Sequence, residues 1–568
     1  MKKIYFTLLT FLFFVVAHSQ IVNIPNANFK AKLLTASPSN QIASSQTPVY
    51  NSSNNSWTVS SYNKIDTNND GQIQVSEAQT IKYLKLSGGG ITNLEGIVSF
   101  INIVFLSCQS NPLPSLNVQG LDNLQSLDCR NNLILSLNVQ GLINLQNLDC
   151  SVNQLSSLNV QGLTNLQSLN CGNNQLPSLN AQGLTNLQRL YCSNNQLPSL
   201  NVQGLINLQN LECRNNAILS LNVQGLINLQ NLDYSMNQLP SLNVQGLTNL
   251  QSLNCSNNQI PFLNVQGLTN LQSLSCSNNQ IPFLNVQGLA NLQGLGCSNN
   301  QIPFLNVQGL TNLQSLYCSN NQLPSLNVQG LTNLQILYCD NNQLTSLNVQ
   351  ELTNLYSFGC SNNQLTSLNV QGLTNLQSLY CGNNQLTSLN LPLVLPNFGS
   401  LDCSNNQLTT LDVQGSGIIS LDCSNNQLTE LFINKIYNVG IWDIFDFSNN
   451  PNLAFICANE EDFSLVQTNL NGNTNCQVAS DCSLSVVNNP LDNDYFSIYP
   501  NPVKNELNLS IKQAITIYSL SIYNTLGQQV QTTTNSEKTI DVNGLKTGNY
   551  IMKFTTDKGR LSSKFVKD

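Results

Sequence analysis

The chain has 568 residues, of which only 8% are charged, and its formal net charge is −8 at pH 7. Nucleic-acid-binding proteins normally carry a basic patch or stripe, and none is present here, so no nucleic-acid partner is expected. The only histidine, His18, falls in a segment that we expect to be removed. Histidine bases, histidine triads and histidine metal sites are therefore not expected in the mature chain.

Residues 1–19 have the pattern of a secretory signal peptide. Lys2 and Lys3 form a basic start, residues 8–16 form an apolar run, and residues 17–19 suit a cleavage site. The alternative, a membrane anchor, is disfavoured because the run is shorter than the roughly 20 apolar residues that cross a bilayer. No other stretch predicts a transmembrane segment, so we expect the mature chain to be exported.

Residues 20–83 are predicted to form a separate N-terminal cap. Within it, residues 28–34 favour a short helix, and the polar stretch 37–61 favours a loop. The segment 66–77 has the spacing of an EF-hand calcium-binding loop. The preceding residues 60–65 favour an extended chain, so a complete helix-loop-helix pair is not expected.

The calcium prediction depends on oxygen-bearing residues at the diagnostic positions of this loop. Gly71 suits the sharp turn at position 6. The expected ligands are Asp66, Asn68 and Asp70 at positions 1, 3 and 5, the carbonyl of Gln72 at position 7, and Glu77 at position 12. We therefore expect a structural Ca²⁺ that stiffens the cap. The alternative is a polar turn before a helix over residues 78–84, capped by Ser76.

Residues 84–455 repeat one short phrase about 18 times. The cysteines show the period, because Cys108, Cys129 and Cys150 are each 21 residues apart and the same register continues as far as Cys381. Each turn of about this length has too few apolar residues to fold alone, so the turns must stack to close a common core.

Each copy follows the pattern Leu-x-x-Leu-x-Cys-x-x-Asn-x-Leu and then x-x-Leu-x-Val-x-Gly-Leu. Leu169 and Cys171 alternate as the residues of a strand do, and the glycine permits a bend. Asn174 suits hydrogen bonds to the backbone where the chain leaves the strand. The pattern resembles the leucine-rich repeat, with cysteine in an apolar position. This resemblance implies a mainly β solenoid of 21-residue turns.

Fifteen of the 18 cysteines lie at one register position of the repeats. The alternatives are a disulfide or metal ladder and a stack of buried thiols. Tyr234 and Phe447 occupy the same position, which indicates an apolar environment. Parallel neighbours in register are also farther apart than a disulfide prefers. We therefore expect free thiols that behave as small apolar side chains.

The residue before each cysteine is expected to face outward from its strand, on the surface that such solenoids use for binding. Acidic and amide residues lead this row, and Tyr317, Tyr338 and Tyr380 follow. Tyrosines on an open face offer flat rings and hydroxyls to a protein or a glycan. The alternative is a strand surface without selection for binding. A second aromatic row, expected to stabilise one edge, comprises Phe262, Phe283 and Phe304.

Residues 456–494 are expected to form a C-terminal cap and a linker. Two of the three cysteines Cys457, Cys476 and Cys482 are expected to form a disulfide, because exported proteins retain disulfides. Their spacing leaves the pairing open.

Residues 495–568 contain more lysine and short strand patterns, which predict a compact β domain. Their motifs resemble the C-terminal sorting domain of the type IX secretion system of Bacteroidetes. The residues that carry this resemblance are Tyr499, Pro500, Asn501, Pro502, Gly527, Leu545, Gly548, Tyr550, Gly559 and Lys564. The resemblance implies a β-sandwich that engages the type IX secretion machinery and directs the chain through the periplasm to the cell surface or the extracellular medium. The whole layout is similar to leucine-rich repeat surface proteins of flavobacteria.

The sequence thus predicts an exported protein that binds an unknown extracellular protein or glycan, as an adhesin does. One alternative is a structural spacer without a specific ligand, which the strict repetition favours. The other is a polysaccharide-active enzyme that uses carboxylate pairs such as Asp128 and Asp149. An open, solvated strand face disfavours this alternative, so no catalytic residue is expected.

Overall fold

The structure is a computed structural model that describes residues 20–51, 56–392, 395, 397–414, 416–433, 445–470, 476–480, 496–512, 515–524, 529–533, 539–556 and 559–568. These residues form two compact units, one up to Leu292 and one from Gln293. The predicted signal peptide, residues 1–19, lies outside the described residues.

The first unit begins with the helix α1, Ala27–Leu34, which confirms the predicted helix. The side chain of Asn26 caps it by accepting a hydrogen bond of 2.8 Å from the backbone N–H of Phe29. Phe29 and Leu33 are fully buried on its inner side. The helix therefore depends on one capping residue and one apolar face.

The stretch predicted as a loop contains three short strands instead: β1, Ala43–Ser44; β2, Val49–Asn51; and β3, Ser56–Thr58. Strands β2 and β3 form an antiparallel hairpin in which Tyr50 lies opposite Trp57, with ring centroids 5.3 Å apart. The ring of Trp57 also contacts Phe105, at 6.4 Å. The loop prediction was wrong because two aromatic residues give this polar stretch a surface to pack on the repeats.

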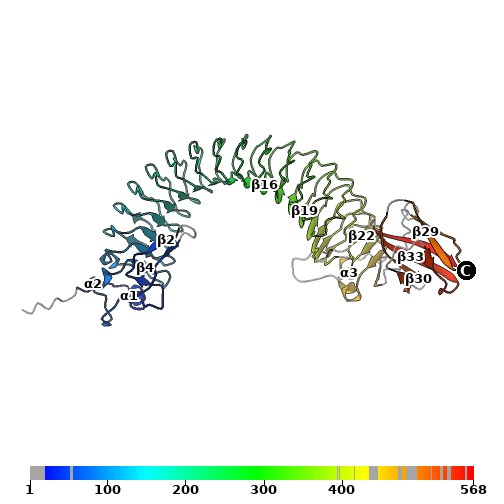
Figure 1. Cartoon of the computed structure of the whole chain (residues 1–568), viewed down its shortest axis with the longest axis horizontal. Coiled ribbons are helices and arrows are strands. Elements are labelled where there is room, and N and C mark those ends of the chain that lie inside the picture. The colour runs from blue at the N-terminus through cyan, green and yellow to red at the C-terminus, as the bar shows by residue number, and fades with distance from the viewer. Residues whose placement is uncertain are drawn as a thin grey trace, which may run out of the picture. The chain divides into compact units, whose positions relative to one another are not determined.

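Beyond the cap, every turn of the first unit contributes one short strand to a parallel sheet, which confirms the predicted solenoid (Figure 1). Strand β1 pairs antiparallel with the first of them, so the cap covers the end of the sheet. The strands are β4, Tyr83–Lys85; β5, Phe105–Ser107; β7, Ser126–Asp128; β9, Asn147–Asp149; β10, Ser168–Asn170; β11, Arg189–Tyr191; β12, Asn210–Glu212; β13, Asn231–Asp233; β14, Ser252–Asn254; and β15, Ser273–Ser275. A 3-10 helix, Ile97–Ser99, follows β4, and β6, Leu116–Asn117, pairs in parallel with β8, Leu137–Asn138.

The core of each turn is formed by the apolar residues of the repeat. In the representative turn, Leu166, Leu169, Cys171, Leu176 and Leu184 are all fully buried. Neighbouring turns pair in register, with Leu169 opposite Leu190. Identical side chains therefore stack on one another along the solenoid, and each turn buries its core against the next.

Asn174 provides the backbone hydrogen bonds that were expected where the chain leaves the strand. Its side-chain amide donates to the carbonyls of Cys171 at 3.0 Å and of Cys150 in the preceding turn at 3.1 Å. Its side-chain oxygen accepts from the backbone N–H of Leu155, also in the preceding turn, at 3.0 Å. Each such asparagine thus joins two turns and satisfies backbone groups that water cannot reach.

Further amide side chains form similar ladders and explain the asparagine- and glutamine-rich composition. Gln161 donates to the carbonyl of Asn180 in the next turn at 2.9 Å. Asn165 donates to the carbonyl of Ile143 in the preceding turn at 2.9 Å. An amide both donates and accepts, so identical side chains in successive turns can link without the repulsion that a ladder of charges would produce.

The second unit continues the same pattern of turns. Its main parallel strands are β16, Gly294–Gly296; β17, Ser315–Tyr317; β18, Ile336–Tyr338; β19, Ser357–Gly359; β20, Ser378–Tyr380; β21, Ser400–Asp402; β23, Ser420–Asp422; and β25, Phe445–Asp446. A second parallel sheet comprises β22, Thr410–Asp412; β24, Glu430–Phe432; β26, Phe455–Cys457; and β27, Gln477–Ala479. The 3-10 helix Glu460–Asp462 and the helix α3, Phe463–Asn469, lie between the last two strands in sequence.

The cysteines of the repeats are free and buried, from Cys108 to Cys423, which confirms the predicted stack of thiols. Tyr234, at the same register position, is also fully buried. In the C-terminal cap, Cys457 is disulfide-bonded and Cys476 is free. Cys457 therefore belongs to the predicted disulfide and Cys476 does not, whereas Cys482 lies outside the described residues.

The C-terminal domain is a β-sandwich, as expected. One antiparallel sheet comprises β28, Phe496–Tyr499; β29, Glu506–Ile511; and β32, Thr539–Asp541. The other comprises β30, Ile517–Asn524; β31, Gln529–Thr533; β33, Gly548–Thr556; and β34, Gly559–Lys567. Residues of both sheets, including Leu507 and Met552, share one buried core.

Candidate functional site

From β7 to β23, the last residue of each main strand forms the predicted row, and most of these residues are partly exposed. In β11, for example, Leu190 is buried and Tyr191 is half-buried. In β12, Glu212 is exposed. The strands therefore alternate between the core and the surface as predicted, and the side chains of this row lie side by side in successive turns.

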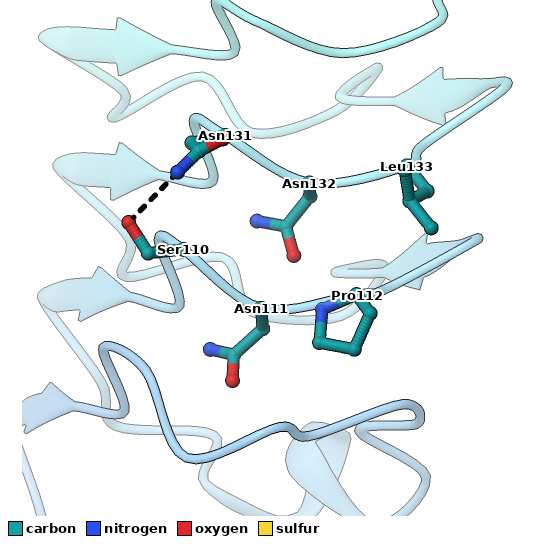
Figure 2. Close-up of a pocket in the computed structure, with 6 residues that line it drawn as sticks. All are labelled: Ser110, Asn111, Pro112, Asn131, Asn132 and Leu133. Atoms are coloured by element: carbon teal, nitrogen blue, oxygen red, sulfur yellow. Dashed lines mark hydrogen bonds between the residues drawn. The ribbon is translucent and has the colours of Figure 1, made fainter.

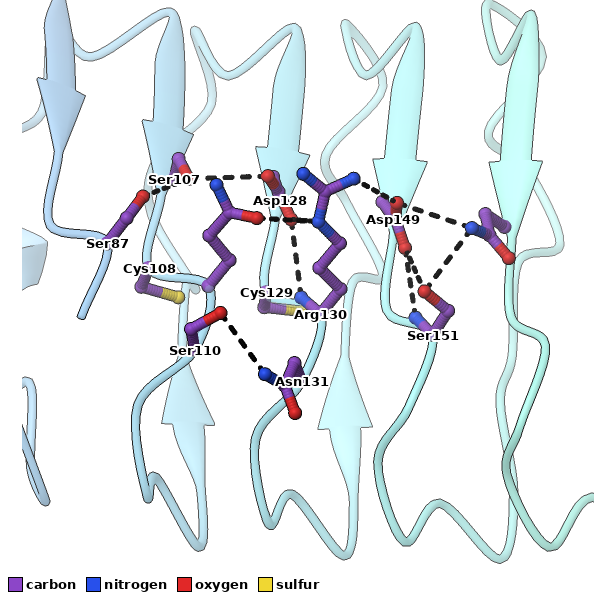
Figure 3. Close-up of polar contacts among 12 residues, drawn as sticks. Ser87, Ser107, Cys108, Ser110, Asp128, Cys129, Arg130, Asn131, Asp149 and Ser151 are labelled. Atoms are coloured by element: carbon purple, nitrogen blue, oxygen red, sulfur yellow. Dashed lines mark hydrogen bonds and ion pairs between the residues drawn. The ribbon is translucent and has the colours of Figure 1, made fainter. Parts of the chain in front are cut away.

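The acidic part of the row forms a polar cluster around Arg130 (Figure 3). The guanidinium of Arg130 lies 3.6 Å from Asp128 and 3.4 Å from Asp149. Its Nε also donates to Gln109 at 2.6 Å. The hydroxyl of Ser151 donates to Asp149 at 2.6 Å. Both carboxylates are therefore held by groups of the protein itself.

We expected these carboxylates on an open, solvated face, but Asp128 is largely buried. Burial raises the pKa of Asp128 to about 6, and neighbouring Arg130 opposes part of this effect. The turn-by-turn packing of side chains in the row removes water that a single exposed strand would retain. The cluster is satisfied internally, so its geometry does not indicate a bound substrate.

A shallow hollow of about 300 Å³ lies beside this cluster, between the turns that follow β5 and β7 (Figure 2). It is lined by Ser110, Asn111, Pro112, Asn131, Asn132 and Leu133. The amide of Asn132 donates to the carbonyls of Cys108 and Cys129 at 3.1 and 3.0 Å. The hollow is thus walled by the structural asparagine ladder and contains no titratable group.

The three predicted tyrosines form one stack in the second unit. The rings of Tyr317 and Tyr338 are nearly parallel, at an angle of 4° with centroids 5.7 Å apart. The rings of Tyr338 and Tyr380 are stacked at 6.4 Å. The hydroxyls of Tyr338 and Ser357 lie 2.8 Å apart, within hydrogen-bond distance. Burial and the neighbouring Tyr338 raise the pKa of Tyr317.

Tyr338 and Tyr380 come from strands that are separated by a complete turn. Two turns of a parallel sheet span about 9.6 Å, so the contact at 6.4 Å requires the rings to lean together. The residue between them is Gly359, and a Cβ atom there would lie 2.5 Å from Cδ1 of Tyr338. The stack therefore depends on Gly359, a residue that the sequence analysis did not single out.

The second aromatic row lies at the surface. Phe262 and Phe283, in the first unit, are 62% and 55% exposed, respectively. Phe304, in the second unit, is 59% exposed. These rings follow a proline in the bend after the strand and are largely exposed, and their role in stabilising one edge stays a prediction.

The predicted calcium-binding loop is ordered by its own side chains. Asp66 accepts a hydrogen bond from the backbone N–H of Gly71 at 3.2 Å. Asp70 accepts from the N–H of Gln72 at 2.8 Å. Asn68 accepts from the N–H of Asp70 at 3.0 Å. Asn69 and Gly71 both have positive φ angles, 62° and 76°, and produce the sharp turn.

The two ends of this loop differ from the alternative prediction. The following helix, α2, spans Val75–Ala78, and its N-cap is Gln74 rather than Ser76. Tyr83 already belongs to strand β4, so the helix predicted over residues 78–84 is not formed. In the described part of the chain, no three acidic, cysteine or histidine side chains converge closely enough to hold a metal ion by themselves.

Several residues of the predicted sorting motif stabilise the C-terminal sandwich. The amide of Asn501 donates to the carbonyl of Lys564 at 3.1 Å and accepts from the N–H of Val566 at 2.8 Å. Tyr550 is buried and donates to the carbonyl of Lys546 at 2.8 Å. Tyr499, by contrast, is 54% exposed.

The remaining motif residues take backbone and core positions. Pro500 and Pro502 flank Asn501 in the segment after β28, and Leu545 packs on the sandwich core. Gly548 and Gly559 begin the paired strands β33 and β34. Gly527 lies outside the described residues.

Comparisons with known proteins agree with both parts of the fold. Residues 497–568 match the family of secretion system C-terminal sorting domains, and residues 374–415 match two copies of leucine-rich repeats. Among curated proteins, no relative matches this chain significantly. None of the helices in the described segments is long and apolar enough to cross a membrane.

Solved structures similar to this chain come from several bacteria. The functional domain of InlJ from Listeria monocytogenes, which includes a cysteine ladder, is 21% identical, with a TM-score of 0.55 over 88% of this chain and 93% of its own. A leucine-rich repeat protein of Leptospira interrogans is 27% identical, with a TM-score of 0.53 over 68% and 98%. YopM from Yersinia enterocolitica is 23% identical, with a TM-score of 0.50 over 66% and 91%.

The stacked turns, their cysteine position and these matches define the class: this is a leucine-rich repeat protein. Its C-terminal β-sandwich is a sorting domain of the type IX secretion system. The chain is therefore a cargo of that machinery and is exported to the cell surface or the extracellular space.

Proposed function

We propose that this chain is a surface binding protein that holds an extracellular protein partner against the stack of Tyr317, Tyr338 and Tyr380. The observation that carries the proposal is the contact between Tyr338 and Tyr380 across Gly359. Solvent-exposed strands of a spacer need no such contact, whereas a recognition surface benefits from aromatic side chains that are already fixed in place.

The geometry of the stack favours a protein over a glycan. The inner faces of the three rings cover one another, so the rings mainly offer their edges and hydroxyls to a partner. Sugars pack on open aromatic faces, whereas tyrosine edges and hydroxyls are common in protein interfaces. Fixed tyrosines of this kind are frequent hot spots of binding energy.

The test uses residues 20–568 on arrays of extracellular matrix proteins and of glycans. A variant in which Tyr317, Tyr338 and Tyr380 are replaced by alanine is compared with Tyr191→Ala, which removes a tyrosine at the same register position outside the stack. We expect the parent and Tyr191→Ala to bind a protein, and the triple variant to bind it at least about tenfold more weakly.

Three other results would replace this proposal. Binding to glycans alone would make the stack a sugar-binding surface. Equal binding by the parent and the triple variant would place the site elsewhere on the solenoid. No binding by any of the three chains would support the structural spacer instead.

A further inference from the structure

We propose that residues 66–77 bind one Ca²⁺ ion, with Gln74 as a ligand in addition to the residues that the motif names, and that the ion locks the N-terminal cap onto the first turn of the solenoid. The proposal rests on unpartnered oxygen atoms, on the uncompensated charge of the loop and on the connections of its two ends.

Asp66 presents the first unpartnered oxygen. Its side chain is only 5% exposed, and its Oδ2 accepts the hydrogen bond from Gly71. Its Oδ1 is buried and has no hydrogen-bond partner. A buried carboxylate oxygen without a partner is costly, and a cation at loop position 1 would remove this cost.

Gln74 presents the second unpartnered oxygen. It is also 5% exposed, and its amide nitrogen donates to Oδ2 of Asp70 at 2.7 Å. Its Oε1 is buried and faces the N–H of Glu77 in a capping-box arrangement, but it forms no hydrogen bond of acceptable geometry. Gln74 stands at position 9 of the loop when Asp66 is position 1, and EF-hand loops often bind the ion at this position directly or through water. The motif alone did not identify Gln74, because many residue types occur there.

Glu77 already closes the loop in the way that a position-12 ligand must. It is 7% exposed and accepts hydrogen bonds of 2.7 Å from both the N–H and the hydroxyl of Thr67. Its other oxygen accepts from the N–H of Gln74 at 3.0 Å. The carboxylate thus spans the loop, and one oxygen can exchange an N–H or hydroxyl partner for the ion.

The negative charge of the loop is not neutralised by the protein. Among the described residues, no lysine or arginine forms an ion pair with Asp66, Asp70 or Glu77. The nearby Lys30 donates to the amide oxygen of Gln72 at 2.6 Å, and Lys64 contacts the amide oxygen of Asn69. The loop therefore offers carboxylate, amide and carbonyl oxygens and no nitrogen or sulfur ligand. Ca²⁺ prefers such an all-oxygen ligand set.

The loop also connects the cap to the solenoid. The N–H of Val22 donates to the carbonyl of Ile73 at 2.8 Å, and the N–H of Val75 donates to the carbonyl of Gln20 at 2.8 Å. Helix α2 then leads into β4, the first strand of the solenoid sheet. An ion that fixes the loop would consequently fix the start of the chain beside the first turn.

The experiment measures Ca²⁺ binding to residues 20–568 after removal of metal with a chelator. Isothermal titration with CaCl₂ is expected to show one site, and Ca²⁺ is expected to raise the first unfolding transition by about 5 °C. MgCl₂ is expected to bind more weakly. Asp66→Asn retains an oxygen for the N–H of Gly71 but removes the charge, and is expected to weaken binding by about 100-fold. Asp122→Asn, an exposed carboxylate on a nearby turn, is the matched control.

Gln74→Met removes the second oxygen at nearly constant length and is expected to weaken binding by about tenfold. If Ca²⁺ gives neither heat nor a thermal shift at about 10 mM, well above the affinity of weak extracellular sites, the proposed site does not exist. If Asp66→Asn binds as tightly as Asp122→Asn, the ion binds elsewhere. If Asp66→Asn weakens binding but Gln74→Met retains full affinity, the loop binds Ca²⁺ but Gln74 is not a ligand.

Discussion

The ring of Tyr338 lies across Gly359. A methyl group on Gly359 would stand 2.5 Å from Cδ1 of Tyr338 and 2.8 Å from an oxygen of Asp340. Gly359→Ala should therefore separate Tyr338 from Tyr380 and cost about 1–3 kcal/mol of stability, as overpacking does. The near-UV circular dichroism of the tyrosines and the unfolding midpoint measure both effects. In Gly399→Ala the new methyl group meets only Ile419, at 3.5 Å, so this control should change neither. An unchanged tyrosine spectrum in Gly359→Ala would show that the stack does not depend on the glycine.

Val152 occupies a left-handed backbone position, with a φ angle of 53°. The equivalent residue of the next turn, Asn173, has a φ angle of 54°. A β-branched residue is disfavoured in this conformation, whereas asparagine adopts it readily. Val152 is 45% exposed, so its replacement removes little buried apolar surface. Val152→Asn is therefore expected to raise stability by about 1 kcal/mol, measured as a higher urea midpoint. The reverse change, Asn173→Val, should lower the midpoint, and a gain of stability there would contradict the argument.

The buried thiols predict a loss of stability at alkaline pH. Burial raises the pKa of Cys171 and of Cys297 from 9.0 to about 12. Above pH 9 these groups lose protons in the unfolded chain but keep them in the folded chain, so stability is complete below pH 9 and falls between pH 9 and about 12. We expect the unfolding temperature in reductant to fall steadily over this range.

The same burial predicts that a thiol reagent discriminates between the cysteines. At pH 8 the partly exposed Cys476, whose pKa burial raises to about 11, should react slowly in the folded chain, whereas the fifteen buried thiols should react only after urea is added. Rapid reaction of the folded chain at many cysteines would show that the thiol stack opens readily.

Asp128 should destabilise the first unit at neutral pH. Burial raises its pKa from 3.8 to about 6. The stability that protonated Asp128 contributes is therefore complete below pH 3.8 and is lost as the pH rises through 6. Asp128→Asn keeps the oxygen that accepts from Ser107 and removes the buried charge. We expect the variant to be more stable than the parent by about 1–2 kcal/mol at pH 7.5 and to show no advantage at pH 3.5. A variant that is less stable at both values would mean that the attraction between Asp128 and Arg130 exceeds the cost of burial.

Most of the solenoid could be predicted because its information is local and repeated. The alternation of Leu169 and Cys171 indicates a strand, and the buried Tyr234 at a cysteine position confirms that this position is apolar. Asn174 could be assigned to the backbone because its residue type and place recur in every turn. Repetition thus replaces the information that would otherwise come from comparing related sequences.

The features that sequence reasoning missed depend on contacts between different parts of the chain. Tyr50 and Trp57 form a hairpin only because Trp57 can pack on Phe105, far along the sequence. Gly359 is identified as essential to the tyrosine stack only when the lean of Tyr338 is known. Gln74 resembles an ordinary polar residue until its buried, unpartnered oxygen is seen. In each case the sequence gives the residue type and its spacing, but the direction of the side chain in the fold decides the role of the residue.

The in-register pairing of Leu169 with Leu190, and of every later turn with its neighbour, has a consequence for the gene. A crossover between two misaligned copies of the nearly identical repeats would remove or add a complete turn, and the flanking turns would meet through the same leucines and asparagines as before. Such an event changes the length of the solenoid by one step while the cap and the sorting domain remain intact. The tyrosine stack needs three particular turns in order, so only an exchange within those turns would disrupt it.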